Sequence, residues 1–163
     1  MRHARRLSIA ALALLLPAAP AWAEWGATKW GMTLTEVLDA VPGARPLKQE
    51  GTKGDVWKHH RLASAPWQDG KFAMIADFYF EPDTNRLGFV KSEPVNIADC
   101  PALETEMVTR HGAGTREDRD IGDMHLLVIR WVDPATSERL LYSSFYGRGQ
   151  PPRFCHFIQQ APV

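Results

Sequence analysis

Two segments of this chain share one hairpin pattern, and this repetition constrains the fold more than any other feature. Residues 72–90, FAMIADFYFEPDTNRLGFV, are two runs of alternating apolar residues around a Pro-Asp-Thr-Asn turn. Residues 126–142, LLVIRWVDPATSERLLY, repeat the arrangement with one more residue in the connection. Strands that are joined by short turns pair antiparallel. The sequence therefore predicts two β-hairpins in two related parts of the chain.

A helical pattern precedes each hairpin. Thr33 and Glu36 have the spacing of a capping box, and an apolar stripe of Leu34, Val37, Leu38 and Val41 follows them. A second helix is expected from Asp99 to His111, with Asn96 or Asp99 as its cap and with Gly112 after its last residue.

The order of these patterns predicts the fold class. Further strands are expected at 56–62 and 153–160, whereas 44–55, 64–70 and 113–123 have the composition of loops and turns. The order helix, three strands, helix, three strands indicates an internal duplication, with units at about 24–95 and 96–163. We expect one α+β domain, with an antiparallel sheet of about six strands and two helices on one face.

The N-terminal residues have the order of a secretory signal peptide. Three arginines precede an apolar run at 7–16, and an Ala-Trp-Ala segment ends at Ala23. A membrane anchor is the alternative, but a spanning helix needs roughly 18 or more apolar residues, and this run stops at Pro17, with Pro20 shortly after it. We expect cleavage after Ala23 and a periplasmic or secreted protein that does not span a membrane.

The charge of the remaining chain argues against nucleic acid as a partner. Residues 1–23 carry three of the 19 basic residues and none of the 19 acidic ones, so their removal leaves 16 basic against 19 acidic residues. The rest has no run of Lys and Arg, which would form the positive surface that nucleic acid binding requires.

The two cysteines, Cys100 and Cys155, are expected to form a disulfide, because an even number of cysteines in an exported chain indicates pairing. Two buried free thiols are one alternative. A redox pair is another, although the cysteines lack the Cys-x-x-Cys spacing of thioredoxin-like proteins.

The residues that open the first helix carry a family resemblance. Residues 30–37, WGMTLTEV, resemble the helix opening of the small outer-membrane lipoprotein A family and its relatives, which include the tandem-repeat β-lactamase inhibitor proteins. The doubled order of helix and strands is similar to that of the inhibitors. The resemblance implies a binding module, assembly factor or protein inhibitor that uses the open face of its sheet. This chain lacks the lipidated cysteine, and its second unit has residues 99–101, DCP, in place of residues 31–33, GMT.

No established catalytic motif occurs, so we expect no catalytic residue, no metal and no cofactor. His59 and His60 are the most metal-like pair, but neighbouring residues of a strand point to opposite faces. The alternative is a small hydrolase that uses a histidine with a carboxylate, such as His125 with Asp123. His60 with Asp77 is a second pair of this kind.

The two hairpins differ on one face. When they are aligned at Phe80 and Val132, Asp77 corresponds to Ile129, so the second hairpin is apolar on both faces. Either another part of the chain, such as residues 25–30, covers the additional apolar face, or a partner does. In the second case exposed aromatic residues would mark a binding surface. The expected partner-binding residues are then Trp57, Tyr79, Leu127, Ile129 and Trp131.

These observations favour an exported, disulfide-bonded, non-enzymatic binding or protein-interaction module. Its partner is expected to be another protein or a component of the cell envelope.

Overall fold

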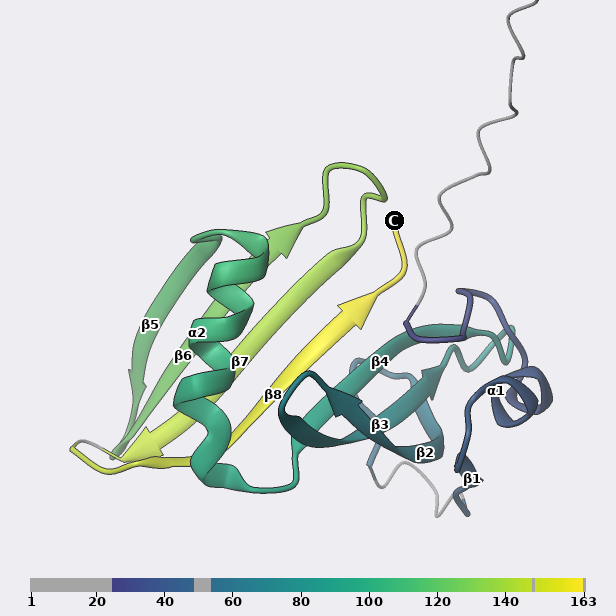
Figure 1. Cartoon of the computed structure of the whole chain (residues 1–163), viewed down its shortest axis with the longest axis horizontal. Helices are drawn as coiled ribbons and strands as arrows, with labels where there is room; N and C mark the ends of the chain where they lie inside the picture. The colour runs from purple at the N-terminus through teal and green to yellow at the C-terminus, as the bar shows by residue number, and fades with distance from the viewer. Residues whose placement is uncertain (1–24, 49–53, 148, 163) are drawn as a thin grey trace, which may run out of the picture.

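The computed structural model describes residues 25–48, 54–147 and 149–162, and the expected signal peptide at 1–23 lies outside them. The described residues form one antiparallel sheet of eight strands and two α-helices (Figure 1). The helices are α1 (Leu34–Ala40) and α2 (Cys100–His111), and the short 3-10 helix η1 (Ile97–Asp99) leads into α2. The strands are β1 (Arg45–Pro46), β2 (His60–Asp69), β3 (Phe72–Phe80), β4 (Leu87–Pro94), β5 (Thr115–Ile121), β6 (Met124–Val132), β7 (Arg139–Gly147) and β8 (Pro152–Gln160).

The expected α+β fold with about six strands is wrong, because the protein is mostly β. Strand β5 replaces an expected loop: its residues are nearly all polar, and they show no apolar alternation. It forms because it pairs with β6 from Thr115 to Ile121 across a tight turn at Gly122, which has a φ of 61°. At the edge of the sheet a strand needs no second neighbour and tolerates charged side chains.

Strand β2 also differs from the expectation, since it begins at His60 and continues through the segment that was expected to be a turn. Pro66 is tolerated there because β1 pairs only with Ala63 and Ser64, which leaves Pro66 on a free edge of β2. Val56, where the strand was expected to begin, forms only an isolated bridge with His59.

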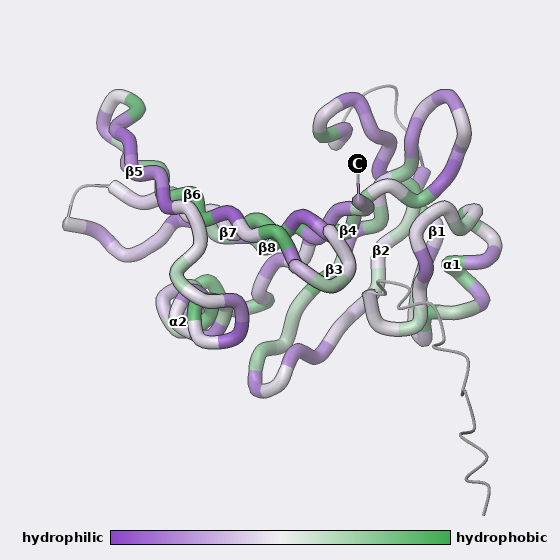
Figure 2. The backbone as a smooth tube through the Cα atoms, turned by 90° about the horizontal axis from the view of Figure 1, so that it is seen from above, coloured by the Kyte–Doolittle hydropathy of each residue, from purple (hydrophilic) through white to green (hydrophobic). Residues whose placement is uncertain are grey.

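The strand order is β1-β2-β3-β4-β8-β7-β6-β5, so the first four and the last four strands meet where β4 pairs with β8. Figure 2 shows the sheet from its edge, with α2 lying on one side of β6, β7 and β8. The additional residue expected in the second hairpin connection does not lengthen its turn, because the same hydrogen bond closes both turns: Glu81 N donates to Arg86 O, and Asp133 N donates to Glu138 O.

Both helices begin and end where the sequence predicts. In α1 the Thr33 amide donates to the Glu36 carboxylate at 2.7 Å and the Glu36 amide donates to the Thr33 hydroxyl at 3.3 Å, which confirms the capping box. Helix α2 ends at His111, and the cap residue Gly112 after it has a φ of 82°, which suits glycine.

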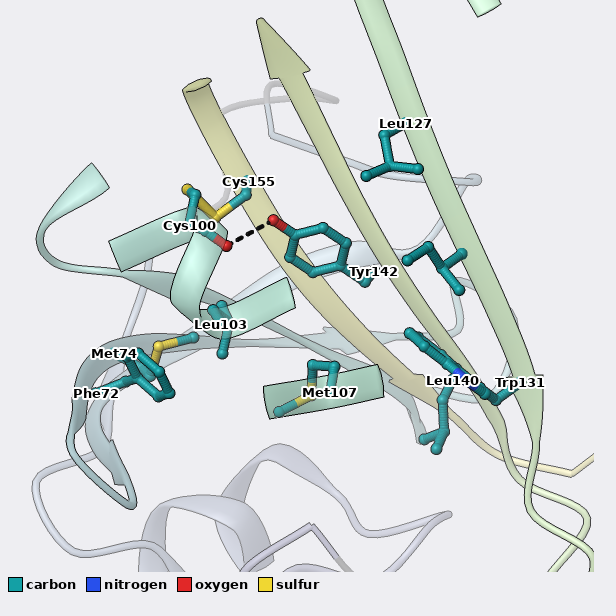
Figure 3. Packing of buried hydrophobic residues seen from close by; sticks show 11 residues of the cluster. Phe72, Met74, Cys100, Leu103, Met107, Leu127, Trp131, Leu140, Tyr142 and Cys155 are labelled. Carbon is teal, nitrogen blue, oxygen red and sulfur yellow. Dashed lines mark hydrogen bonds between the residues drawn. A yellow bond between two sulfur atoms is a disulfide. The ribbon is translucent and has the colours of Figure 1, made fainter. Parts of the chain in front are cut away.

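The helices cover the same face of the sheet in two apolar clusters. Helix α1 contributes Val37 to a cluster that includes Ala63 and Phe78. Helix α2 packs with Leu103 and Met107 on the other half of the sheet, as Figure 3 shows.

A disulfide joins the start of α2 to β8, which confirms the expected pairing of Cys100 with Cys155. Beside it the Tyr142 hydroxyl donates to the Cys100 carbonyl at 3.0 Å (Figure 3). The disulfide is compatible with an oxidising, exported location. Within the described part of the chain, neither helix has the length and apolar character to cross a membrane.

Candidate functional site

The face of the sheet opposite the helices is the candidate functional site, and we call it the helix-free face. Cys155 and Phe157 of β8 belong to the cluster around α2, so the side chains between and beside them point the other way. Cross-strand pairing extends this face over six strands. Its central members are Ile75, Asp77, Tyr79, Phe89, Lys91, Glu93, Val128, Arg130, Val132, Arg139, Leu141, Ser143, Phe154, His156, Ile158 and Gln160.

Exposed apolar side chains gather on the helix-free face. Among the described residues, four of the seven exposed large apolar side chains lie there: Trp57 (51% exposed), Ile75 (41%), Val132 (65%) and Phe154 (40%). Single exposed apolar residues are normal, but a group on one face marks a surface for a partner.

Trp57 stands at the tip of a tight two-residue turn above this face. Val56 and His59 close the turn through a hydrogen-bonded bridge, and Trp57 and Lys58 have φ values of 48° and 68°. Such turns normally carry Asn or Gly, because other side chains are strained in left-handed conformations. Strain of this kind persists where the surrounding structure holds it, and it concentrates at functional sites. The turn therefore presents a large aromatic side chain at the expense of local backbone energy.

Aromatic packing holds the turn against the sheet. The Trp57 ring lies 5.4 Å from the Phe89 ring and the His59 ring lies 5.1 Å from it, while Phe89 stacks on Tyr79 at 4.3 Å. His59 Nδ1 lies 3.1 Å from the Trp57 carbonyl oxygen, and His60 Nδ1 lies 2.9 Å from Asp55 Oδ2. The position of the exposed indole is thus set by buried neighbours.

Two grooves lie beside Trp57, and its side chain lines both of them. One groove has a volume of about 540 Å³ and is lined by Trp57, Lys91, Glu93, Phe154 and His156, together with Val56 and Ile158. The other, of about 420 Å³, is lined by Trp57, Arg130, Val132, Arg139, Leu141 and Gln160, with Trp131 and Leu140 at its boundary. Each groove combines an apolar floor with charged groups at its edge.

Charged pairs lie beside the apolar side chains of the face. Lys91 Nζ donates to Glu93 Oε1 at 2.8 Å, and Arg130 Nη1 donates to Glu117 Oε2 at 2.9 Å. Burial opposes the charge of Lys91, but the hydrogen bond to Glu93 and the neighbouring Tyr79 outweigh it and raise the pKa of Lys91. Lys91 therefore remains a cation in the first groove at neutral pH.

A serine and a histidine meet beside the first groove. Ser143 of β7 is opposite His156 of β8, and Ser143 Oγ lies 2.9 Å from His156 Nε2. Burial first, and then the charge of Lys91, lower the pKa of His156 to about 4, so the ring is neutral at pH 7. Its Nδ1 is buried and has no hydrogen-bond partner among the described residues. The sequence contained no spacing signal for this pair, because it forms across two strands.

Four of the five expected partner-binding residues are buried, so the expected exposed patch is wrong for them. Tyr79, Leu127 and Ile129 are each 1% exposed and Trp131 is 6% exposed. Leu127, Ile129 and Trp131 lie in the cluster under α2, and the Trp131 indole donates to the Gly112 carbonyl at 2.8 Å. Only Trp57 of this set is exposed.

The alignment of the two hairpins predicted that Asp77 and Ile129 lie on the same face of the sheet. This prediction is wrong, because the two residues face opposite sides. Asp77 lies on the helix-free face and accepts a hydrogen bond from Arg61 Nη1 at 3.1 Å, whereas Ile129 faces α2. An offset of one residue sends every side chain of a strand to the other face. The additional apolar face of the second hairpin is therefore covered by α2 and not by residues 25–30.

The histidine–carboxylate pairs expected for a hydrolase do not form as predicted. His125 lies 2.9 Å from Asp120 and 3.2 Å from Asp118, on the exposed edge of the sheet, in place of a contact with Asp123. His60 contacts Asp55, and Asp77 contacts Arg61. These pairs lie on separate elements, so they do not combine into one site.

Within the part of the chain that the structure describes, no group of three or more His, Cys, Asp or Glu side chains is arranged to hold a metal ion. Comparison of the chain with models of protein families, with curated proteins and with solved structures finds no match.

Proposed function

We propose that this protein is an exported, non-enzymatic interaction module that binds another protein through the Trp57 turn and the two grooves beside it. The observation that carries the proposal is the strained turn that holds an exposed tryptophan between two grooves with apolar floors. Tryptophan, tyrosine and arginine dominate the binding energy of protein interfaces, where they fill pockets at the centre of the contact.

The arrangement around Trp57 has the composition of such a centre. The indole is the anchor, the exposed Phe154 and Val132 extend the apolar surface on its two sides, and Arg130 and Arg139 line one groove. Charged pairs form the rim, where they contribute to orientation and specificity more than to affinity.

The contribution of Trp57 to binding can be estimated from its exposure. A tryptophan buries about 150–250 Å² when it is fully enclosed, and half of this surface is still exposed in the free protein. At about 25 cal/mol per Å², burial of that half against a partner contributes about 2 kcal/mol, or a factor of ~30 in the dissociation constant.

The test is capture of partners by the immobilised mature protein from a periplasmic extract of the native cell, with quantitative identification of the proteins that bind. Three baits are compared: the unchanged protein, Trp57→Ala, and the control Ile121→Ala. Ile121 is a matched control because it is 49% exposed and lies on the edge strand β5.

We expect at least one protein to bind the unchanged bait and Ile121→Ala but not Trp57→Ala, with all three baits folded by thermal unfolding. Equal capture by Trp57→Ala would contradict the proposed role of this turn.

A further inference from the structure

A second concavity lies on the opposite side of the sheet, between α2 and the first half of the molecule. Its volume is about 270 Å³, and its walls come from β3, α2, β8 and the segment at Trp25. This is just below the range of about 300–1,000 Å³ for sites of drug-sized molecules, so the cleft suits a small ligand. We call it the junction cleft, because it lies where the two halves of the sheet meet. It is separate from the helix-free face, so a ligand in the cleft does not depend on the partner proposed for that face.

The floor of the junction cleft contains a buried hydroxyl group without a partner. Ser92 is 4% exposed, and its Oγ has no hydrogen-bond partner among the described residues. Ser92 is opposite Phe157 in the β4–β8 pair, and both line the cleft, so the Ser92 side chain points to this side of the sheet. Buried polar groups are normally paired, and an exception requires an explanation. A polar group of a bound molecule would supply the missing partner.

Aromatic rings line one wall of the apolar part of the cleft, and Leu103, Met107 and Leu140 also contribute to its lining. Trp25 and Trp67 lie with their ring centres 4.5 Å apart, and Met74 and Phe157 complete this wall. The faces of aromatic rings carry partial negative charge and attract cations.

The charged groups of the cleft are mainly carboxylates. Asp69, Asp133 and Glu138 line it, and Arg110 is the one arginine or lysine among the described lining residues. Arg110 is already paired, since it donates to Asp69 at 2.7 Å and to Glu106 at 2.8 Å.

The pKa shifts of His111 and Asp133 preserve this negative balance at pH 7. Burial first, and then the charge of Arg110, lower the pKa of His111, so this histidine is neutral. Backbone amides of Thr136 and Ala135 lower the pKa of Asp133, which keeps it ionised. Glu138 is 5% exposed and accepts hydrogen bonds from two neutral donors, the indole of Trp30 and the amide of Gln159.

We infer that the junction cleft binds a small organic ammonium ion, a protonated amine on a compact apolar or aromatic group. The ammonium group donates to the Ser92 hydroxyl and is attracted by Asp133 and Glu138, while the apolar group packs on Trp25 and Trp67. An anion would be repelled by the carboxylates, and a neutral molecule would gain no electrostatic attraction from them.

The test uses three probes of one shape and different charge: phenethylammonium, 2-phenylethanol and phenylacetate. Binding to the mature protein is measured at pH 7 by ligand-observed NMR and calorimetry. We expect phenethylammonium to bind at least about tenfold more tightly than the alcohol, and phenylacetate to bind more weakly still. Equal binding of the alcohol, or the absence of binding by the amine, would overturn the inference.

Two variants test the roles that we assign to the Ser92 hydroxyl group and to the Asp133 carboxylate. Ser92→Ala removes an unpaired buried group, so we expect an unchanged or higher Tm without ligand and a several-fold loss of phenethylammonium affinity. Asp133→Asn retains the carbonyl oxygen that accepts from the turn amides and is expected to weaken only the binding of the cation.

A lower Tm of Ser92→Ala with unchanged affinity for the amine would assign Ser92 a structural role and would refute its role in binding. Ile121→Ala serves as the control, because Ile121 lies on the edge strand β5 and does not line the cleft, so the substitution should leave amine binding unchanged.

Discussion

Acidification from pH 7 to pH 5 is expected to destabilise the protein through His156, whose partly buried ring is held in its neutral form. Its Nε2 lies 2.9 Å from Ser143 Oγ, and its Nδ1 has no partner among the described residues. Burial and the charge of Lys91 lower the pKa of His156 from 6.5 to about 4, while Glu93 acts in the opposite direction.

The direction of the effect follows from proton uptake. The unfolded chain binds a proton at His156 with a pKa near 6.5, whereas the folded protein does so only near 4. Between these values the unfolded state binds more protons, so the free energy of unfolding decreases as the pH falls. The stabilising contribution is fully present above pH 6.5 and is lost on the way to pH 4. From pH 7 to pH 5 the loss is about 2 kcal/mol.

The assay is urea unfolding of the unchanged protein and of His156→Gln at pH 7, 6 and 5. Glutamine does not titrate, and its amide can still bond with Ser143. The carboxylates with lowered pKa values, Glu36, Asp118 and Asp133, lose their contribution mainly below pH 5 and do so in both proteins. His111 and His125 titrate in both proteins, so the comparison removes their effects.

The unfolding free energy of the unchanged protein should fall by about 2 kcal/mol more than that of His156→Gln between pH 7 and pH 5. An equal pH dependence of the two proteins would refute the conclusion that the folded state excludes the charged imidazole.

Three further substitutions test the structure. Replacement of Cys100 and Cys155 by Ala opens a disulfide between residues 55 apart and should destabilise the protein by about 4 kcal/mol in chemical denaturation. Tyr142→Phe removes the donor to the Cys100 carbonyl and should lower the unfolding free energy by about 1 kcal/mol. Gly88→Ala would place a Cβ 2.7 Å from His59 Nε2, so it should displace that ring, loosen the turn above it and reduce partner capture; a crystal structure with His59 unmoved would contradict this expectation.

Signals that act within a few residues were sufficient to predict the local elements. The capping box at Thr33 and Glu36 marks the start of α1, and the turns after Phe80 and Val132 mark the two hairpins. The disulfide followed from the even number of cysteines in a chain for which an export signal is predicted. Each of these features depends on chemistry that neighbouring residues or a simple count reveal.

Features that depend on pairing between distant residues were not predictable in this way. Strand β5 has no apolar alternation, since its order comes from the ladder with β6 and from its place at the edge. Which face of the sheet Asp77 and Ile129 occupy depends on the strand register, because an offset of one residue moves every side chain of a strand to the other face. Ser143 and His156 meet only because β7 and β8 pair in one register.

Trp57 was the one expected binding residue that the structure leaves exposed, and it was predicted for a partly wrong reason. The sequence suggested an aromatic surface that it would share with Tyr79 and Trp131. The structure instead places Trp57 on a strained turn above Phe89, while Tyr79 and Trp131 support the core.

The most direct test of the central proposal is partner capture by Trp57→Gly, compared with the unchanged protein. Glycine adopts the φ of 48° at this position without strain, which offsets part of the packing of the indole on Phe89 that the substitution removes. We expect a protein that still folds cooperatively, together with the loss of a protein that the unchanged bait retains. Full retention of every captured protein by a folded Trp57→Gly bait would contradict the proposal.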